Sequence, residues 1–525
     1  MSERVHRSLL NIKVGMIFYI ISIILAFFSR RVFLDCLGEE FIGLTGMLNN
    51  ILTFLSVAEL GIGSSIVYFL YKPLQEDDHD KINEVMSMLA FLYRCIGLII
   101  GGIGIVISLF FPWWFGNLTV GLHLVYFAFY IFLAQSIVGY IINYRQLLLS
   151  ANQKQYIVSA YFQTMGIVQY ILQIALAYYW RNLYLWVAVG LVFTIIGCII
   201  LNRRINKEYP WLQIDLKAGR KMLRTYPEVF KKTRQVFTLK MKDFILYRSD
   251  ELLVGAFVSV TQVAFYGNYT MIVNKLIYVV NILADGMSAG VGNLIAEGNK
   301  QNIMKVFWEM TATRFFIMGM VIYPLIMFIQ PLICCWVGSE YLLPSIIAYL
   351  LIFNLFIRLQ YITVNMFIVA SGLYDDVWTN WTELAVNIIV TLALAPYFGI
   401  VGILLGKIIS IFYFQIFWKP YYLFSRGFHY STWIYWRGMT PYFIIFFVFC
   451  IIAFLLKFIV IDNNDISWLS LIGLGFATII PLLSIYFLFL FMFTSGMKYF
   501  VARSPKAYHY ISRINNIKEK SNNEK

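Results

Sequence analysis

Charged residues are scarce in this sequence. Asp, Glu, Lys and Arg make up only 13% of the 525 residues, whereas 60% are hydrophobic and the mean hydropathy is +0.74. A soluble protein of this length needs far more charged surface to cover its core. Apolar runs of about 20 residues also recur along the whole chain, and each is long enough to cross a bilayer. The sequence therefore predicts an all-α polytopic membrane protein whose solvent is the lipid bilayer.

Cysteine and histidine are also few and scattered. The six cysteines and five histidines show no spacing typical of a metal site or of a disulfide framework. The segment GIVGILLGKIIS at 399–410 is similar to a phosphate-binding loop, but Gly402 stands four residues before Gly406 instead of five, and Ile follows Lys407. In an apolar run such glycines are typical of close helix packing. We therefore expect no metal, no cofactor, no direct use of ATP and no enzymatic site.

Fourteen apolar runs are candidate membrane spans. They begin near residues 12, 41, 85, 119, 156, 183, 236, 265, 306, 342, 377, 400, 439 and 467. Arg30 and Arg31 follow the first run where a signal peptide has a small-residue cleavage site, so we interpret this run as an uncleaved span. Most of the 41 Lys and Arg residues fall on one side when the amino terminus is inside. The positive-inside rule thus predicts that both termini are cytoplasmic.

A weak internal repeat divides the chain into halves. FIGLTGMLNNIL at 41–52 aligns with FYGNYTMIVNKL at 265–276, and further on Arg94 falls opposite Arg314. Both copies follow an even number of spans, which indicates a parallel repeat with its axis along the membrane normal. We expect two pseudo-symmetric six-helix lobes over 1–202 and 236–420, a basic cytoplasmic amphipathic linker over 203–235, two additional spans over 421–495 and a basic cytoplasmic tail over 496–525.

The second and eighth spans carry matching polar stripes, each with one carboxylate. The stripe of the second span contains Asn49, Thr53, Ser56, Glu59 and Gly63. That of the eighth contains Asn274, Tyr278, Asn281, Asp285, Ser288 and Gly292. Steps of three and four residues put each set on one face of a helix. Because lipid would reject such a face, we expect the stripes to point at each other or at a watery cavity.

Several segments, in order, resemble the polysaccharide flippases of O-antigen, capsule and exopolysaccharide pathways. The first half carries RRVFLDCLGEEFIGLTGMLNN followed by AELGIGSSIVYFLYKPL, and the second carries YGNYTMIVNKL, WVGSEYLLPS, ASGLYDD and GIVGILLGKIIS. The likeness covers about residues 10–425 and departs from the family pattern at Lys407, where a small hydroxyl residue is usual. This family belongs to the superfamily of multidrug and toxin exporters and lipid II flippases.

The resemblance implies twelve to fourteen helices in two lobes, alternating access and a multi-pass location in the bacterial inner membrane. The implied substrate is an undecaprenyl-pyrophosphate-linked oligosaccharide, moved from the cytoplasmic to the periplasmic leaflet. Polysaccharide polymerase, chain-length machinery and membrane lipids are the expected partners, and nucleic acid is not. Related lipid II flippases hold the pyrophosphate with arginines of the first span and of the second lobe. Arg30 and Arg31 stand close to that first-span position.

Cations within or at the ends of spans are candidates for binding the pyrophosphate, because Arg meets phosphate oxygens with a bidentate fork. They are Arg30, Arg31, Arg248, Lys275 and Arg358. The alternative for Arg30 and Arg31 is that they snorkel to the outer interface. For Arg94 and Arg314, which lie nearer the inner surface, we expect snorkelling or structural pairing.

Three carboxylates, Glu59, Asp250 and Asp285, are candidates for binding a coupling ion, either H⁺ or Na⁺. A carboxylate at a site that is alternately wet and dry can load and release a proton. The alternative is structural: Glu59 and Asp285 would hydrogen-bond across the lobe interface or pair with an arginine.

Two other functions compete with that of a flippase. A cation-coupled multidrug or metabolite exporter of the same fold could use the same carboxylates, but its cavity is expected to be less cationic. A membrane enzyme such as an O-antigen polymerase or acyltransferase needs an acid-base cluster in a sizeable outer loop, and the predicted outer loops are short. We therefore favour the flippase.

Overall fold

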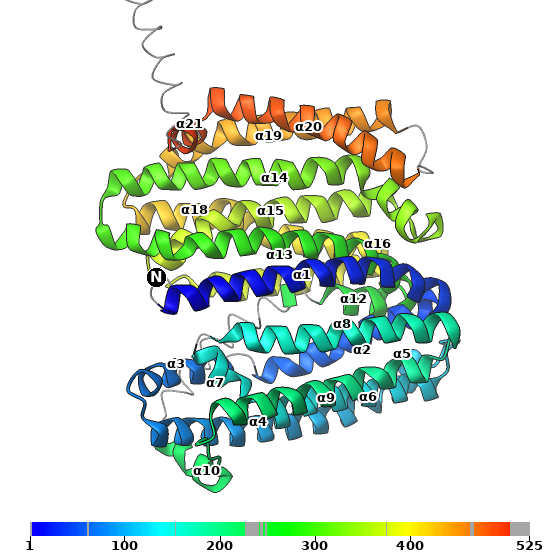
Figure 1. Ribbon diagram of the computed structural model, residues 1–525. Coiled ribbons are helices and arrows are strands. Elements are labelled where there is room, and N and C mark those ends of the chain that lie inside the picture. Colours follow the sequence, from blue (N-terminus) through cyan, green and yellow to red (C-terminus); the bar gives the residue numbers. More distant parts are fainter. Residues whose placement is uncertain are drawn as a thin grey trace, which may run out of the picture. The chain divides into compact units, whose positions relative to one another are not determined.

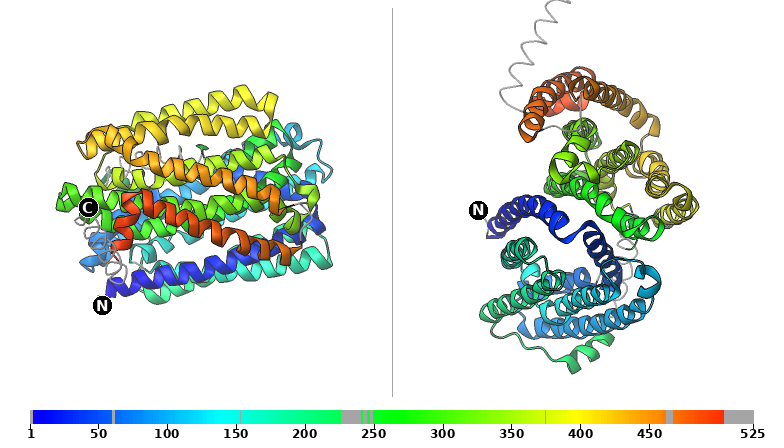
Figure 2. Two further views of the ribbon diagram at one scale, coloured as in Figure 1. Left: turned by 90° about the horizontal axis from the view of Figure 1, so that it is seen from above. Right: turned by 90° about the vertical axis from the view of Figure 1, so that its right-hand side faces the viewer.

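The computed structural model is helical throughout the part of the chain that it describes. It describes residues 3–59, 62–152, 154–225, 241, 245–246, 249–373, 375–461 and 467–503, without the side chains of 3–12, 57–58, 64–65, 68, 223–225, 282–289, 293, 296 and 377. Helix contacts divide the chain into two compact units, Met1–Gly267 and Asn268–Lys525. Within each unit the long helices run side by side (Figure 1), and the right-hand view of Figure 2 looks along them.

Eleven helices among the described residues are long and apolar enough to cross a membrane, so the protein is a multi-pass membrane protein. Fourteen spans were predicted, and those expected near residues 41, 236 and 265 are not among the eleven. The first of these is interrupted, as shown below, and much of the second lies outside the described residues. The third corresponds to α13 (Val260–Glu297), a helix of 38 residues. Fourteen spans therefore stay a prediction.

The first unit is a bundle in which α1 packs on α8, α8 on α9, α9 on α6 and α6 on α4. Its helices are α1 (Glu3–Leu37), α2 (Glu39–Leu55), η1 (Ser56–Glu59), α3 (Ile62–Gln75), α4 (His79–Ser108), α5 (Phe111–Phe115), α6 (Leu122–Asn143), α7 (Gln146–Ala151), α8 (Gln155–Tyr179), α9 (Leu183–Glu208), α10 (Leu216–Thr225) and α12 (Asp250–Phe257). The first turns of α13 also belong to this unit, which ends at Gly267.

The second predicted span is not one continuous helix. Its polar side chains donate to their own backbone: Asn49 Nδ2 to Thr45 O, Thr53 Oγ1 to Asn49 O, and Ser56 Oγ to Thr53 O. Such back-bonds compete with the helical ladder and bend helices. The α-helix ends at Leu55, and residues 56–59 form a 3₁₀ turn before α3 begins at Ile62. The expectation that the stripe lies on one face of one helix is therefore wrong.

Helix α10 lies within the residues expected to form an amphipathic linker, and it packs on α4. The contact is close at Gly219, where a Cβ would lie 2.2 Å from Ser87 O. Before α10, the Trp211 ring stacks on that of His79 at 3.8 Å. Asp78 caps the start of α4, and the hydrogen bond from the Lys81 side chain lowers the pKa of the Asp78 carboxyl.

The second unit is arranged around α14, which contacts α15, α19, α20 and α21 and lies between α15 and the α19–α20 pair in Figure 1. Its helices after α13 are α14 (Lys300–Val337), η2 (Ser339–Tyr341), α15 (Ser345–Ala370), α16 (Val377–Phe398), α17 (Ile400–Phe412), α18 (Lys419–Tyr422), α19 (Thr432–Val460), α20 (Trp468–Phe493) and α21 (Ser495–Ala502), with π-helical turns η3 (Tyr413–Trp418) and η4 (Leu423–Gly427) on either side of α18.

Two buried tyrosines hold α20 against α14. Tyr486 of α20 donates to Phe315 O at 2.9 Å, and its ring meets that of Tyr323 edge-on at 5.1 Å. Gly319 allows this approach, because a Cβ there would lie 2.6 Å from the Tyr486 ring. Since a hydroxyl removed from water must find a partner, these bonds fix the depth at which the helices pack.

Helices α16 and α17 pack closely at two glycines of the GIVGILLGKIIS segment. A Cβ on Gly402 would lie 2.5 Å from Leu394 O, and one on Gly406 would lie 2.2 Å from Thr391 Oγ1. Only glycine allows the two backbones to come so near. The prediction that these glycines serve helix packing is confirmed.

Candidate functional site

Glu59 lies where the second predicted span is interrupted, and its carboxylate faces α4 of the same unit. Tyr93 of α4 donates its hydroxyl to Glu59 Oε1 at 2.5 Å. Tyr93 is buried and meets the ring of Tyr140 of α6 edge-on at 5.7 Å. The polar stripe had suggested Asn or Ser partners in the other lobe or an arginine, but the described contact is a tyrosine of its own unit.

Gly63, also in the predicted stripe, makes room for this pair. A Cβ there would lie 2.8 Å from the Tyr93 hydroxyl and 3.3 Å from Glu59 Oε1. A methyl group at this position would push the hydroxyl away from the carboxylate. The glycine therefore belongs to the Glu59 site through its lack of a side chain.

A second carboxylate of the first unit is also held by a tyrosine. Asp250, the first residue of α12, is 9% exposed and accepts a hydrogen bond of 2.9 Å from the Tyr266 hydroxyl. Its neighbour Glu251 accepts from Asn50 Nδ2 at 2.6 Å. These bonds connect α12 to the start of α13 and to α2. Asp250 and Glu59 thus share one arrangement, in which a phenol hydroxyl satisfies one oxygen of a carboxylate.

Arg30 and Arg31 differ strongly in their surroundings. Arg30 is half-buried in α1, and its Nη2 donates to Ala264 O at 2.9 Å. Gly267 permits the approach, because a Cβ there would lie 3.1 Å from Arg30 Nη2. Arg31 is exposed, and its Nε lies 3.7 Å from Oδ2 of Asp35, one turn further along the same helix. Of the two, Arg30 is therefore built into the first unit, whereas Arg31 lies on its surface.

The remaining predicted residues belong to other parts of the chain. Lys275 of α13 and Arg358 of α15 lie in the second unit, and both are half-buried. Asp285 lies in α13, but its side chain is outside the described part, and Arg248 is outside it altogether. Among the described residues, no group of three or more His, Cys, Asp or Glu side chains comes together as ligands for a metal.

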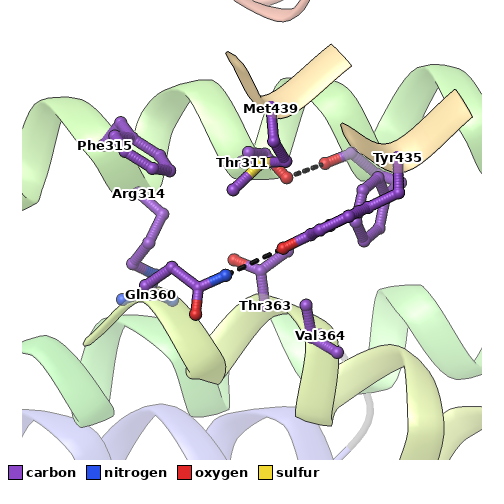
Figure 3. A pocket seen from close by; sticks show the side chains of 9 residues that line it. Thr311, Arg314, Phe315, Gln360, Thr363, Val364, Tyr435 and Met439 are labelled. Atoms are coloured by element: carbon purple, nitrogen blue, oxygen red, sulfur yellow. Dashed lines mark hydrogen bonds between the residues drawn. The ribbon is translucent and has the colours of Figure 1, made fainter. Parts of the chain in front are cut away.

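The second unit buries a cation that sequence reasoning placed elsewhere. Arg314 of α14 is only 3% exposed, so of the two expectations for this residue, snorkelling or structural pairing, snorkelling is wrong. It lines a small cavity, seen in Figure 3, with Gln360 and Thr363 of α15 and Tyr435 of α19. Its internal repeat partner, Arg94 of α4, is exposed. The repeat pointed to position 314, but only the packing of α15 and α19 over it removes the side chain from solvent.

A buried ion pair also escaped sequence reasoning. Lys419 Nζ of α18 lies 2.7 Å from Asp376 Oδ2, directly before α16, and both side chains are less than 10% exposed. Nothing in the sequence around the DD dipeptide at 375–376 indicates that Asp376 is buried. Lys407 of α17 is likewise buried, at 4% exposed, so this departure from the family pattern lies inside the second unit.

Neither a protein-family model nor a curated protein sequence matches the chain. Solved structures do match. Lipid II flippase MurJ in its inward closed conformation aligns with a TM-score of 0.63 and 17% identity, over 90% of this chain and 98% of that one. The chain has a MurJ-like fold. An inward-facing multidrug resistance MATE family transporter of the MOP superfamily aligns with a TM-score of 0.54 and 13% identity, over 75% of this chain and 93% of that one.

These likenesses concern the fold. Both aligned chains are transporters, and this chain shares their helical fold, not the fold of an enzyme family. They also give a frame for the buried charges: in a transporter, ionisable groups within spans pair with one another or mark the path of a substrate or ion.

Proposed function

We propose that this transporter is a flippase for undecaprenyl-pyrophosphate-linked oligosaccharide repeat units, used to make O-antigen, capsule or exopolysaccharide. It moves its cargo from the cytoplasmic to the outer leaflet of the bacterial inner membrane by alternating access, coupled to H⁺ or Na⁺. In this proposal the chain has fourteen spans in two six-helix lobes with two additional helices, and both termini are cytoplasmic. Polysaccharide polymerase and chain-length machinery are its partners.

The observation that carries the proposal is Arg30, a half-buried cation within an apolar helix of a flippase-like fold. Ionisable residues within membrane spans commonly mark the path of a substrate or ion. Besides the bond from its Nη2 to Ala264 O, the Arg30 guanidinium has the fork geometry that matches the oxygens of a lipid pyrophosphate. Lys275 and Arg358 are the corresponding candidates in the second unit, and Arg31 and Arg248 complete the set.

Ion coupling is assigned to the carboxylates Glu59, Asp250 and Asp285. Support comes from the arrangement at Glu59 and Asp250, where a tyrosine hydroxyl binds each carboxylate away from bulk water. Such a site can accept a proton by exchanging the roles of donor and acceptor with the phenol. Glu59→Gln is therefore expected to change the dependence of transport on pH or Na⁺. A variant that matches the wild type at every pH and Na⁺ concentration would remove Glu59 from the coupling step.

The cargo can be tested in cells that depend on the protein for polysaccharide export. Arg30→Ala should reduce export at least about tenfold, because a charged hydrogen bond is worth about 1.5–3 kcal/mol. Membrane insertion, measured with a carboxy-terminal reporter, should be unchanged. Arg181→Ala, at an exposed turn between α8 and α9, is the matched control. Normal export from the Arg30 variant would contradict the proposal, and drug efflux without any export defect in a deletion strain would favour the multidrug exporter.

A further inference from the structure

Arg314 presents an electrostatic problem inside the second unit. Its guanidinium is almost fully buried, yet Nε and Nη1 have no hydrogen-bond partner within the described residues. Nor does any described carboxylate lie within ion-pair distance of it. The nearest acid along α14 is Glu309, which points about 140° away around the helix, at 3.6 residues per turn, and pairs with Arg503. An arginine stays protonated in proteins, so Arg314 cannot lower the free-energy cost of burying its charge by becoming neutral.

The wall of the cavity next to Arg314 is otherwise uncharged and carries hydroxyl groups. Among the described residues, neither the Thr363 hydroxyl nor Gln360 Oε1 has a hydrogen-bond partner. Tyr435 accepts a 2.9 Å hydrogen bond from Gln360 Nε2, which leaves the phenol hydrogen available to donate. Figure 3 shows these side chains converging from three helices on one space. The rest of the lining is Thr311, which donates to Phe307 O, and apolar side chains.

The space itself suits a ligand of one atom. The cavity offers about 10 Å³ to the centre of a water-sized sphere, which is the room that one water molecule needs. Phosphate, sulfate and carboxylates are too large for it. A neutral water would use the donors but leave the charge of Arg314 uncompensated, whereas a monatomic anion uses the donors and cancels the charge.

We propose that Arg314, Thr363 and Tyr435 form a binding site for a small monovalent anion of the halide class, with chloride as its cellular occupant. The anion sits between α14, α15 and α19 and ties these helices together. It replaces the carboxylate that a buried arginine ordinarily requires. The site lies within the second unit and does not depend on the identity of the transported cargo.

Anion-dependent thermal unfolding of the purified full-length protein tests this proposal. The melting temperature is measured while NaCl replaces sodium gluconate at constant ionic strength. Binding to the folded state should raise the melting temperature of the wild type with increasing chloride. Arg314→Gln, which keeps hydrogen-bonding groups but loses the charge, should weaken the apparent chloride affinity at least about tenfold, as expected for a charged hydrogen bond. Arg94→Gln, at the exposed repeat position, should behave as the wild type.

Thr363→Val keeps the test decisive if Arg314→Gln does not fold. It preserves the charge and nearly the shape while removing one donor, and it should weaken the apparent chloride affinity about two- to tenfold. Bromide exchange followed by anomalous diffraction should place a peak beside Arg314. Equal chloride dependence in the wild type, Arg314→Gln and Thr363→Val would overturn the proposal. So would a wild type that does not respond to chloride, since the cavity would then hold water only.

Discussion

The hydrogen bond between Tyr93 and Glu59 allows a quantitative prediction about the first unit. Tyr93→Phe removes the hydroxyl and leaves Glu59 Oε1 without its described donor. An unsatisfied buried polar group costs about 1–3 kcal/mol, and bonds to charged groups lie at the upper end of this range. We therefore expect a loss of about 2 kcal/mol in the free energy of unfolding. For a unit of this size, that corresponds to a fall of about 4 °C in melting temperature.

The assay is thermal unfolding of the purified protein, which a thiol-reactive dye reports. It is applied to a double-mutant cycle that consists of Tyr93→Phe, Glu59→Met and the double variant. Tyr130→Phe is the matched control, since its hydroxyl lies 2.9 Å from Ser108 Oγ in a neutral pair between α4 and α6 of the same unit. That change should cost only about 1 kcal/mol. The Tyr93–Glu59 coupling should be at least about 1 kcal/mol.

Gly63 gives an independent check of the same geometry. A methyl group at this position would lie 2.8 Å from the Tyr93 hydroxyl. Gly63→Ala should therefore destabilise the wild type more than it destabilises the Tyr93→Phe variant, in which the obstructing oxygen is gone. Two results would refute the reasoning: a coupling between Tyr93 and Glu59 that is zero within about 0.5 kcal/mol, or an equal cost of Gly63→Ala in both backgrounds.

Two further predictions concern the second unit. Lys419→Met should destabilise the protein by about 3–5 kcal/mol, because it leaves the charge of Asp376 buried and unpaired. Adding Asp376→Asn should restore most of this loss in the same unfolding assay, and a double variant as unstable as Lys419→Met would contradict the account. Gly406→Val should abolish correct folding, since its Cβ alone would lie 2.2 Å from Thr391 Oγ1. Gly473→Val, in the exposed part of α20 where no atom of the described residues lies within 4 Å of a built Cβ, should be tolerated. Equal yields of monodisperse protein from both variants would argue against the close α16–α17 contact.

Composition and hydrophobic runs were sufficient to predict a helical membrane protein, because the bilayer forces apolar residues into segments of defined length. The break after Leu55 was not predicted. Side chains such as Thr53 and Ser56 fit helical spacing whether they face a cavity or bond to their own backbone, and only the structure separates these cases. A stripe of Asn, Thr and Ser before a glycine is nonetheless the sequence signal that could have indicated it.

The site was predictable only in part for a similar reason. Glu59 stood out because a carboxylate is rare in an apolar run, but Tyr93 is one of 36 tyrosines and nothing in its spacing marks it as the partner. The internal repeat drew attention to Arg314. Its predicted closeness to the inner membrane surface suggested that its side chain reaches water there. Burial depends instead on α15 and α19, whose approach to α14 is a property of tertiary packing that one-dimensional patterns do not contain.

Reconstituted translocation is the most direct test of the central claim. Proteoliposomes receive a fluorescent undecaprenyl-pyrophosphate-linked oligosaccharide, and a membrane-impermeant quencher or glycosidase reports its movement between leaflets. The account predicts rapid translocation by the wild type and by Arg181→Ala, and a rate at least about tenfold lower for Arg30→Ala. Translocation by Arg30→Ala at the wild-type rate, or a wild type no faster than empty liposomes across pH and Na⁺ gradients, would contradict it.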